Sequence, residues 1–246
     1  MTITKYNASG NTFVIFHTNT RDDYNKLAIK LCSEEHTDGL IVVVPHDDYD
    51  FEWLFYNNDG STASMCGNGT RAVAHYAQDN KLTGNFVRFL TGAGEISCEI
   101  ENDIVQTTMP KPTIINDEFE EIGLVWHLVD TGVPHLVTIV DDLEKFDLKI
   151  CSQMRYKYNA NVNFAKVEGD ILRVRTYERG VESETQACGT GMTACFLRAL
   201  CLNLIKSETR VYPTSGEELV LKKDENGLYF KGKVIKEYVK EIVDDV

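Results

Sequence analysis

The sequence has no long hydrophobic run, no excess of basic residues and no metal-ligand spacing. Its longest purely aliphatic run is Leu40–Val44, far short of the roughly 20 residues that a membrane helix needs. The first residues contain no basic stretch followed by an apolar one, so we expect no secretory signal and no membrane partner. The 25 Lys and Arg against 38 Asp and Glu give a net charge of −13, which argues against nucleic acid. No Cys-x-x-Cys or His-Glu-x-x-His spacing is present, so we expect no metal.

The composition is that of a globular protein. Of the 246 residues, 43% are hydrophobic and 26% are charged, which excludes a disordered or fibrous chain. A chain of this length forms one large domain or two small ones. The seven cysteines are odd in number and follow no framework spacing, so we expect reduced thiols in a cytoplasmic protein.

Short apolar runs alternate with glycine, asparagine or proline turns along the chain. The segment Pro110-Lys-Pro112 and the acidic stretch after it favour a boundary, which gives domains at 1–112 and 113–246. We leave open that the last strand packs back on the N-terminal half. The pattern predicts helices at 69–80, 143–156 (whole or broken) and 191–204, the last apolar nearly all round, and strands at 13–17, 40–44, 51–56, 86–90, 95–100, 104–108, 124–129, 136–140, 162–167 and 171–178.

The two halves share a sequence motif. The segments Cys66–Ala72 and Cys188–Ala194 both follow the frame Cys-Gly-x-Gly-x-x-Ala, and their cysteines lie 122 positions apart, about half of the chain. Internal duplication is the simplest explanation, and it predicts two similar domains with the motifs in equivalent positions.

This motif suits an activated thiol beside an anion site. A cysteine that precedes glycines at the start of a helix lies at the positive end of the helix dipole, where a thiolate is stabilised. The glycines let backbone N–H groups approach a carboxylate. Two such thiols on opposite faces of a carbon could invert it, one removing the proton and the other returning it. The remaining cysteines are expected to be buried hydrophobes, namely Cys32, Cys98, Cys151, Cys195 and Cys201.

A dinucleotide-binding fold is the rival explanation of the glycines. Its fingerprint needs a strand that runs directly into the first glycine. Here the strands that end at Tyr56 and Glu178 are followed by polar loops of about ten residues before Gly67 and Gly189. We therefore set this class aside.

The segments Asn57–Arg71 and Arg175–Gly191 resemble the two active-site segments of the diaminopimelate epimerase family, and the resemblance covers essentially the whole chain. It implies a cofactor-independent epimerase that interconverts LL- and meso-diaminopimelate in lysine and peptidoglycan precursor biosynthesis. It also implies an α/β (α+β) fold of two pseudo-symmetric domains, each a mixed, mostly antiparallel sheet around a central helix. The site would lie in the cleft between them, and the enzyme would be a homodimer.

The resemblance also implies roles for individual residues. Cys66 and Cys188 would be the two acid/bases, and the pairs Gly67-Asn68 and Gly189-Thr190 would bind the carboxylate at the reacting carbon. The other substrate-binding positions are Asn11, Asn57, Asn161, Glu178 and Arg179, with Arg179 suited to the distal carboxylate and Glu178 also lying beside the cysteines. His135 would be a supporting polar residue.

Simpler roles are open for some of these residues. Asn57 is also a common turn residue, His135 a common loop residue, and Glu178 with Arg179 an ordinary solvated ion pair. The family commonly has Asn where this chain has Val133, so one expected side-chain amide is missing. Two other functions stay open, namely a proline or hydroxyproline racemase-type enzyme of the same fold and a non-catalytic amino-acid-binding relative.

Overall fold

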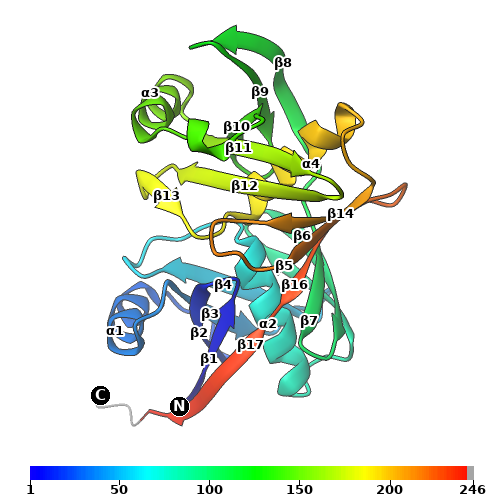
Figure 1. Ribbon diagram of the computed structural model, residues 1–246. Coiled ribbons are helices and arrows are strands. Elements are labelled where there is room, and N and C mark those ends of the chain that lie inside the picture. Colours follow the sequence, from blue (N-terminus) through cyan, green and yellow to red (C-terminus); the bar gives the residue numbers. More distant parts are fainter. Residues whose placement is uncertain (243–246) are drawn as a thin grey trace. The chain divides into compact units, whose positions relative to one another are not determined.

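The computed structural model describes residues 1–242 (Figure 1). The described chain divides into two compact units, one formed by residues 1–108 with residues 231–242, and the other by 109–230. Among the described residues, no helix is long and apolar enough to cross a membrane.

The first unit is one mixed sheet with two helices. Its strands pair in the order β17–β1–β2–β3–β4–β5–β6–β7, with parallel pairing only in β2–β3 and β4–β5. The elements are β1 (Thr2–Ala8), β2 (Asn11–His17), α1 (Asn25–Glu35), β3 (Gly39–Val44), β4 (Phe51–Asn57), α2 (Gly67–Asp79), β5 (Phe86–Thr91), β6 (Gly94–Glu101), β7 (Ile104–Thr108) and β17 (Ile235–Glu241).

Strand β3 shows why this sheet needs a helix on each face. All six of its residues are buried, and successive side chains point to opposite faces. Ile41 and Val43 belong to the apolar cluster that contains the α2 residues. Leu40, Val42 and Val44 pack instead with Ala28, Leu31 and Cys32 of α1. A strand that is covered on both sides reads as a continuous hydrophobic run, which is what the sequence contains here.

Helix α2 is the central helix of the first unit. It contacts β1, β2, β3, β6 and β7, and eleven of its thirteen residues are buried. Its apolar positions are small or aromatic, with Ala72, Val73, Tyr76 and Ala77 at helical spacing. The predicted helix over 69–80 is therefore confirmed, and it begins two residues earlier.

The second unit repeats this design. Its central helix α4 contacts β9, β10, β11 and β12. The elements are β8 (Thr113–Glu121), β9 (Leu124–Asp130), β10 (Pro134–Ile139), the 3-10 turn η1 (Leu143–Lys145), α3 (Leu148–Tyr158), β11 (Asn161–Glu168), β12 (Ile171–Glu178), β13 (Ser183–Thr185), α4 (Gly189–Cys201), β14 (Glu208–Tyr212) and β15 (Leu219–Lys223). Strand β16 (Leu228–Lys233) begins in this unit and continues past its last residue, 230.

Strand pairing gives the same directions in both units. In the first unit, β1–β2 is antiparallel, β2–β3 parallel, β3–β4 antiparallel, β4–β5 parallel and β5–β6 antiparallel. The second has β9–β10 antiparallel, β10–β11 parallel, β11–β12 antiparallel, β12–β14 parallel and β14–β15 antiparallel. Helix α2 precedes β5, the second strand of the parallel pair β4–β5, and α4 precedes β14, the second strand of the parallel pair β12–β14. The two cysteine motifs therefore lie at equivalent positions. This confirms the predicted pair of similar α+β halves.

Several elements differ from the sequence prediction. The patterns do not predict β1, α1 or β8, and β8 is mostly exposed and acidic, so only its pairing with β9 reveals it. The segment 143–156 is broken, with α3 beginning after Asp147, which accepts hydrogen bonds from the N–H groups of Lys149 and Ile150. The predicted helix 191–204 ends at Cys201, because the chain turns at Leu202 and Asn203 has a φ of 56°.

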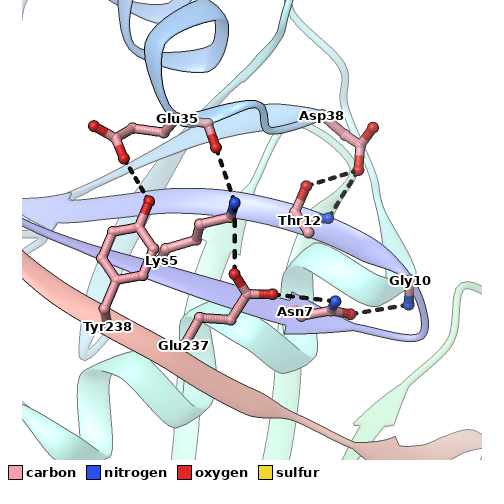
Figure 2. Close-up of polar contacts among 8 residues, drawn as sticks. All are labelled: Lys5, Asn7, Gly10, Thr12, Glu35, Asp38, Glu237 and Tyr238. Atoms are coloured by element: carbon pink, nitrogen blue, oxygen red, sulfur yellow. Dashed lines mark hydrogen bonds and ion pairs between the residues drawn. The ribbon is translucent and has the colours of Figure 1, made fainter.

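Strand β17 is fixed to the first unit by polar contacts as well as by its pairing with β1 (Figure 2). Lys5 forms an ion pair with Glu237 at 3.5 Å and donates a hydrogen bond to the backbone carbonyl of Glu35 at 2.8 Å. The hydroxyl of Tyr238 donates to the Glu35 carboxylate, which also accepts from Lys240 at 2.5 Å. The late strand, the first strand and the end of α1 therefore share one charged network.

Candidate active site

Cys66 occupies the N-cap of α2. Its backbone is extended, with φ −147° and ψ 108°, and its sulfur accepts a hydrogen bond from the Gly69 N–H at 3.4 Å. The side chain is partly exposed. Because Cys66 is the N-cap residue, its sulfur lies where the free amides of the first helical turn point. An added Cβ at Gly69 would lie 3.2 Å from the Trp53 ring. Glycine therefore lets this turn pack against β4 while its amides stay available to an anion.

Buried polar contacts join Asn68 to Asn11. The Arg71 guanidinium is fully buried and donates to the Asn68 side-chain oxygen at 2.7 Å and to the Ser9 hydroxyl at 2.6 Å. The Asn68 amide nitrogen in turn donates to the Asn11 side-chain oxygen at 2.6 Å. Two of the predicted substrate-binding residues are thus brought together, and Arg71 sets the orientation of the Asn68 amide.

A tight turn and one carboxylate hold Gly10 and Thr12, the two neighbours of Asn11 at the start of β2 (Figure 2). Gly10 has a φ of 83°, a conformation that favours glycine, and its N–H donates to the Asn7 side chain at 3.0 Å. Next to Asn11, Thr12 donates to the Asp38 carboxylate through both its N–H at 2.8 Å and its hydroxyl at 3.1 Å. Residues on β1, β2 and the loop before β3 therefore fix this position.

Asn57 lies at the end of β4 and is bonded within its own turn. Its amide donates to the Ser61 hydroxyl at 2.9 Å, and its backbone N–H donates to the Ser61 carbonyl at 2.7 Å. The Ser61 hydroxyl donates on to Asp59 at 2.6 Å. Turn chemistry, the simpler role stated for this residue, accounts for these contacts.

Cys188 occupies the corresponding N-cap of α4. Its backbone is extended, with φ −124° and ψ 106°, its side chain is 8% exposed, and its sulfur lies 3.5 Å from the Thr190 hydroxyl. An added Cβ at Gly191 would lie only 2.4 Å from the Asn163 side-chain oxygen. The second glycine of this motif is therefore required by packing against β11.

His135 is fully buried at the start of β10 beside this helix. Its Nε2 lies 2.9 Å from the Thr190 hydroxyl, and its Nδ1 lies 3.0 Å from the Asn163 side-chain nitrogen. Burial lowers the pKa of His135 to about 3, and the positive charge of Arg179 acts in the same direction. The imidazole is therefore neutral at physiological pH.

The ends of β11 and β12 carry the other predicted residues of the second unit. The Arg179 N–H donates to the Asn161 side-chain oxygen at 2.7 Å, and its guanidinium donates to the Asn159 carbonyl at 2.9 Å. Burial raises the pKa of Glu178, although the Thr185 hydroxyl donates to its carboxylate at 2.9 Å and opposes the shift. Glu178 and Arg179 each have other partners, which differs from the simple solvated pair considered above.

The other five cysteines differ in burial. Burial raises the pKa of Cys98 and of Cys151 to about 12, and it also raises the pKa of Cys32 and Cys195. These four are small buried hydrophobes, as predicted. The prediction is wrong for Cys201, which is exposed because it forms the last turn of α4.

The sequence prediction did not single out Asn163 and Thr176. Asn163 is fully buried and lies two residues after Asn161 on β11, so both side chains point to the same face of the sheet. That alternation is the one sequence signal that could have identified it. Among residues 1–242, no group of three or more His, Cys, Asp or Glu side chains is arranged to hold a metal ion.

The two units, each a mixed sheet around a helix that a cysteine caps, define a class of duplicated α+β folds. This fold is shared with a phenazine biosynthesis protein of the PhzF family from Bacillus anthracis, at a TM-score of 0.77 and 13% identity over 99% of each chain. It is also shared with a hydroxyproline epimerase from Agrobacterium vitis, at a TM-score of 0.70 and 12% identity over 98% of this chain and 91% of that one.

Sequence comparison defines the family within this class. The diaminopimelate epimerase family model matches residues 3–115 and 127–237. A diaminopimelate epimerase from Nitratiruptor is 52% identical over 240 residues, which cover 96% of each chain. The chain belongs to the diaminopimelate epimerase family, a family of isomerases.

Proposed function

We propose that this protein interconverts LL- and meso-diaminopimelate by moving a proton at the α-carbon, with Cys66 and Cys188 as the two acid/bases. The observation that carries the proposal is that both cysteines cap equivalent helices of thirteen residues in the two halves of a duplicated fold. Membership of the diaminopimelate epimerase family supports the substrate.

The reaction balances with two thiols alone. One cysteine enters as thiolate and takes the α-proton, so it becomes a thiol and leaves a carbanion. The other enters as thiol, gives its proton to the opposite face and becomes a thiolate. The products are the inverted α-carbon and an enzyme with the two protonation states exchanged, and no pyridoxal group is needed to complete the cycle.

Stabilisation of the carbanion is the demanding part of this mechanism. The negative charge moves onto the carboxylate beside the reacting carbon. The amides at the N-terminal turns of α2 and α4, at Gly67-Asn68 and Gly189-Thr190, would donate to that carboxylate. These donors are fixed before the reaction because they belong to helices, so little reorganisation is needed as charge develops.

The remaining predicted residues would hold the rest of the substrate. Arg179 has the fork geometry that pairs with the distal carboxylate, and its N–H to Asn161 hydrogen bond aligns these two residues. Asn11 is fixed by Asn68, and Asn57 completes the set. Val133 offers no amide, so the substrate contact at that position would be apolar.

We propose that the enzyme acts in the cytoplasm, as a homodimer, in lysine and peptidoglycan precursor biosynthesis. The cysteine usage supports the location, since the seven cysteines are odd in number and follow no disulfide framework spacing. The family match supports the pathway.

Proton NMR in D2O tests the function. Reduced protein is incubated with LL-diaminopimelate and no pyridoxal phosphate, and we expect the α-proton signal to disappear as the meso isomer forms. Proline and hydroxyproline are the matched controls, and turnover of either imino acid in place of diaminopimelate would favour the racemase alternative. Absence of exchange with all three would contradict the proposal and favour the binding relative.

A further inference from the structure

Five residues of the second unit form a continuous polar path to Cys188. It runs from Thr176 through Asn163, His135 and Thr190, with successive distances of 2.9, 3.0, 2.9 and 3.5 Å. The first three side chains are at most 3% exposed, so water does not compete for these groups. The directions of the first three hydrogen bonds can be derived from one backbone carbonyl.

That carbonyl belongs to Leu136, and it fixes the orientation of the Asn163 amide. The Asn163 side-chain nitrogen lies 2.8 Å from the Leu136 carbonyl oxygen, which can only accept. The group facing Leu136 must therefore be the NH2, and the Asn163 oxygen is left to accept from the Thr176 hydroxyl. The opposite orientation would place two acceptors against each other.

The oriented amide selects one tautomer of His135. The same Asn163 NH2 lies 3.0 Å from Nδ1, so Nδ1 must accept and carry no proton. A neutral imidazole with a bare Nδ1 carries its proton on Nε2. The buried ring stays neutral, in agreement with its depressed pKa. The Asn161 side-chain nitrogen lies 3.4 Å from Nε2, but a protonated Nε2 cannot accept a hydrogen bond from it. That nitrogen donates instead to the Pro134 carbonyl.

The tautomer in turn directs the Thr190 proton. The Nε2–H of His135 donates to the Thr190 hydroxyl oxygen at 2.9 Å. The hydroxyl proton is then free to point away from the ring, toward the Cys188 sulfur at 3.5 Å. A hydrogen bond to a thiolate favours the charged form over the thiol.

We propose that Asn163 is a positioning residue that locks His135 as the neutral Nε2–H tautomer, so that Thr190 donates to the Cys188 thiolate. This inference rests on the proposed function only for its effect on turnover. The tautomer and the reactivity of Cys188 are properties of the protein without substrate.

The first experiment reads the tautomer directly. Long-range proton–nitrogen NMR of protein labelled with 15N-histidine distinguishes a protonated ring nitrogen from a bare one. We expect His135 at pH 7 to show a bare Nδ1 and a protonated Nε2. His127 is an internal reference of the opposite kind, because its Nδ1 donates to the Asp117 carbonyl at 2.5 Å. A His135 ring protonated on Nδ1 would overturn the proposal.

Variants of Asn163 and Thr176 test the cause of the tautomer. In Asn163→Asp a carboxylate faces Nδ1, and we expect the proton to move onto Nδ1. Thr176→Val is the matched control, since it removes the hydroxyl but leaves the Asn163 NH2 on Leu136 and on the ring. An unchanged tautomer in a folded Asn163→Asp protein would contradict the role of Asn163. If that variant does not fold, the wild-type spectrum still decides the tautomer.

Thiol alkylation tests the last link. Iodoacetamide labelling at pH 7, followed by mass spectrometry, gives the rates at Cys188 and Cys66 in one sample. We expect Thr190→Val to lower the Cys188 rate relative to Cys66 by about 10-fold, as loss of a hydrogen bond to a charged group predicts. Thr190→Ser keeps the hydroxyl and should retain the wild-type ratio. Equal ratios in Thr190→Val and wild type would overturn the link, whether or not the protein turns over diaminopimelate.

Discussion

Replacement of Gly191 by alanine perturbs the packing beneath Cys188. The new Cβ would lie 2.4 Å from the Asn163 oxygen, 3.1 Å from the Thr176 hydroxyl and 3.3 Å from the His135 ring. All three neighbours are buried, so none can move into solvent. Overpacking costs about 1–3 kcal/mol, and loss of the Thr176–Asn163 hydrogen bond costs about 1 kcal/mol. The better helix propensity of alanine returns about 1 kcal/mol, which leaves a net loss of about 1–3 kcal/mol.

Urea denaturation followed by circular dichroism measures this loss. Gly84→Ala is the matched control, because no atom lies within 4 Å of its added Cβ, and its stability should change by less than about 1 kcal/mol. Gly69→Ala, the equivalent change in the first motif, meets Trp53 at 3.2 Å and should cost less than Gly191→Ala. A Gly191→Ala protein as stable as Gly84→Ala would refute the packing argument.

Two further predictions concern thiols and charge. Brief iodoacetamide treatment of the folded protein should label the exposed Cys201 but not Cys195, because burial raises the pKa of Cys195. Peptide mass spectrometry measures the labelling, and equal labelling of the two cysteines would contradict the burial of Cys195. Hydrogen bonds from Lys240 and Tyr238 lower the pKa of Glu35 below its ordinary 4.5, so its stabilising effect is present above that pH and is lost as the pH falls through the lowered pKa. Glu35→Gln should therefore reduce the stability of the folded protein at pH 7 and make the fall in stability below pH 4.5 less steep in acid titrations. If the stability of this variant falls with pH as it does in the wild type, the network does not have this role.

The sequence predicts the duplicated design well because its strongest signals are local. The Cys-Gly-x-Gly motif is a short run of neighbouring residues, the helical spacing in 69–80 matches the buried positions of α2, and the continuous run Leu40–Val44 matches a strand that is buried on both faces. Strand β8 has no such period, since most of its side chains are exposed and its conformation depends on β9. Cys201 illustrates the same limit, because the end of α4 decides its exposure.

The candidate site is predictable only in part for a related reason. The positions of Cys66 and Cys188 at helix starts follow from the glycines that come after them. The partners of His135 come from β11 and from the first turn of α4, more than 25 positions away in the chain. Its tautomer depends on the Leu136 carbonyl acting on Asn163, and no pattern of residue types encodes that geometry.

The most direct test of the central claim is epimerisation by Cys66→Ala and Cys188→Ala, each assayed in D2O with LL-diaminopimelate beside the wild-type protein. Circular dichroism establishes that each variant is folded. We expect neither variant to form the meso isomer, because each lacks the acid or the base on one face of the α-carbon. Formation of the meso isomer by either folded variant would contradict the two-base mechanism.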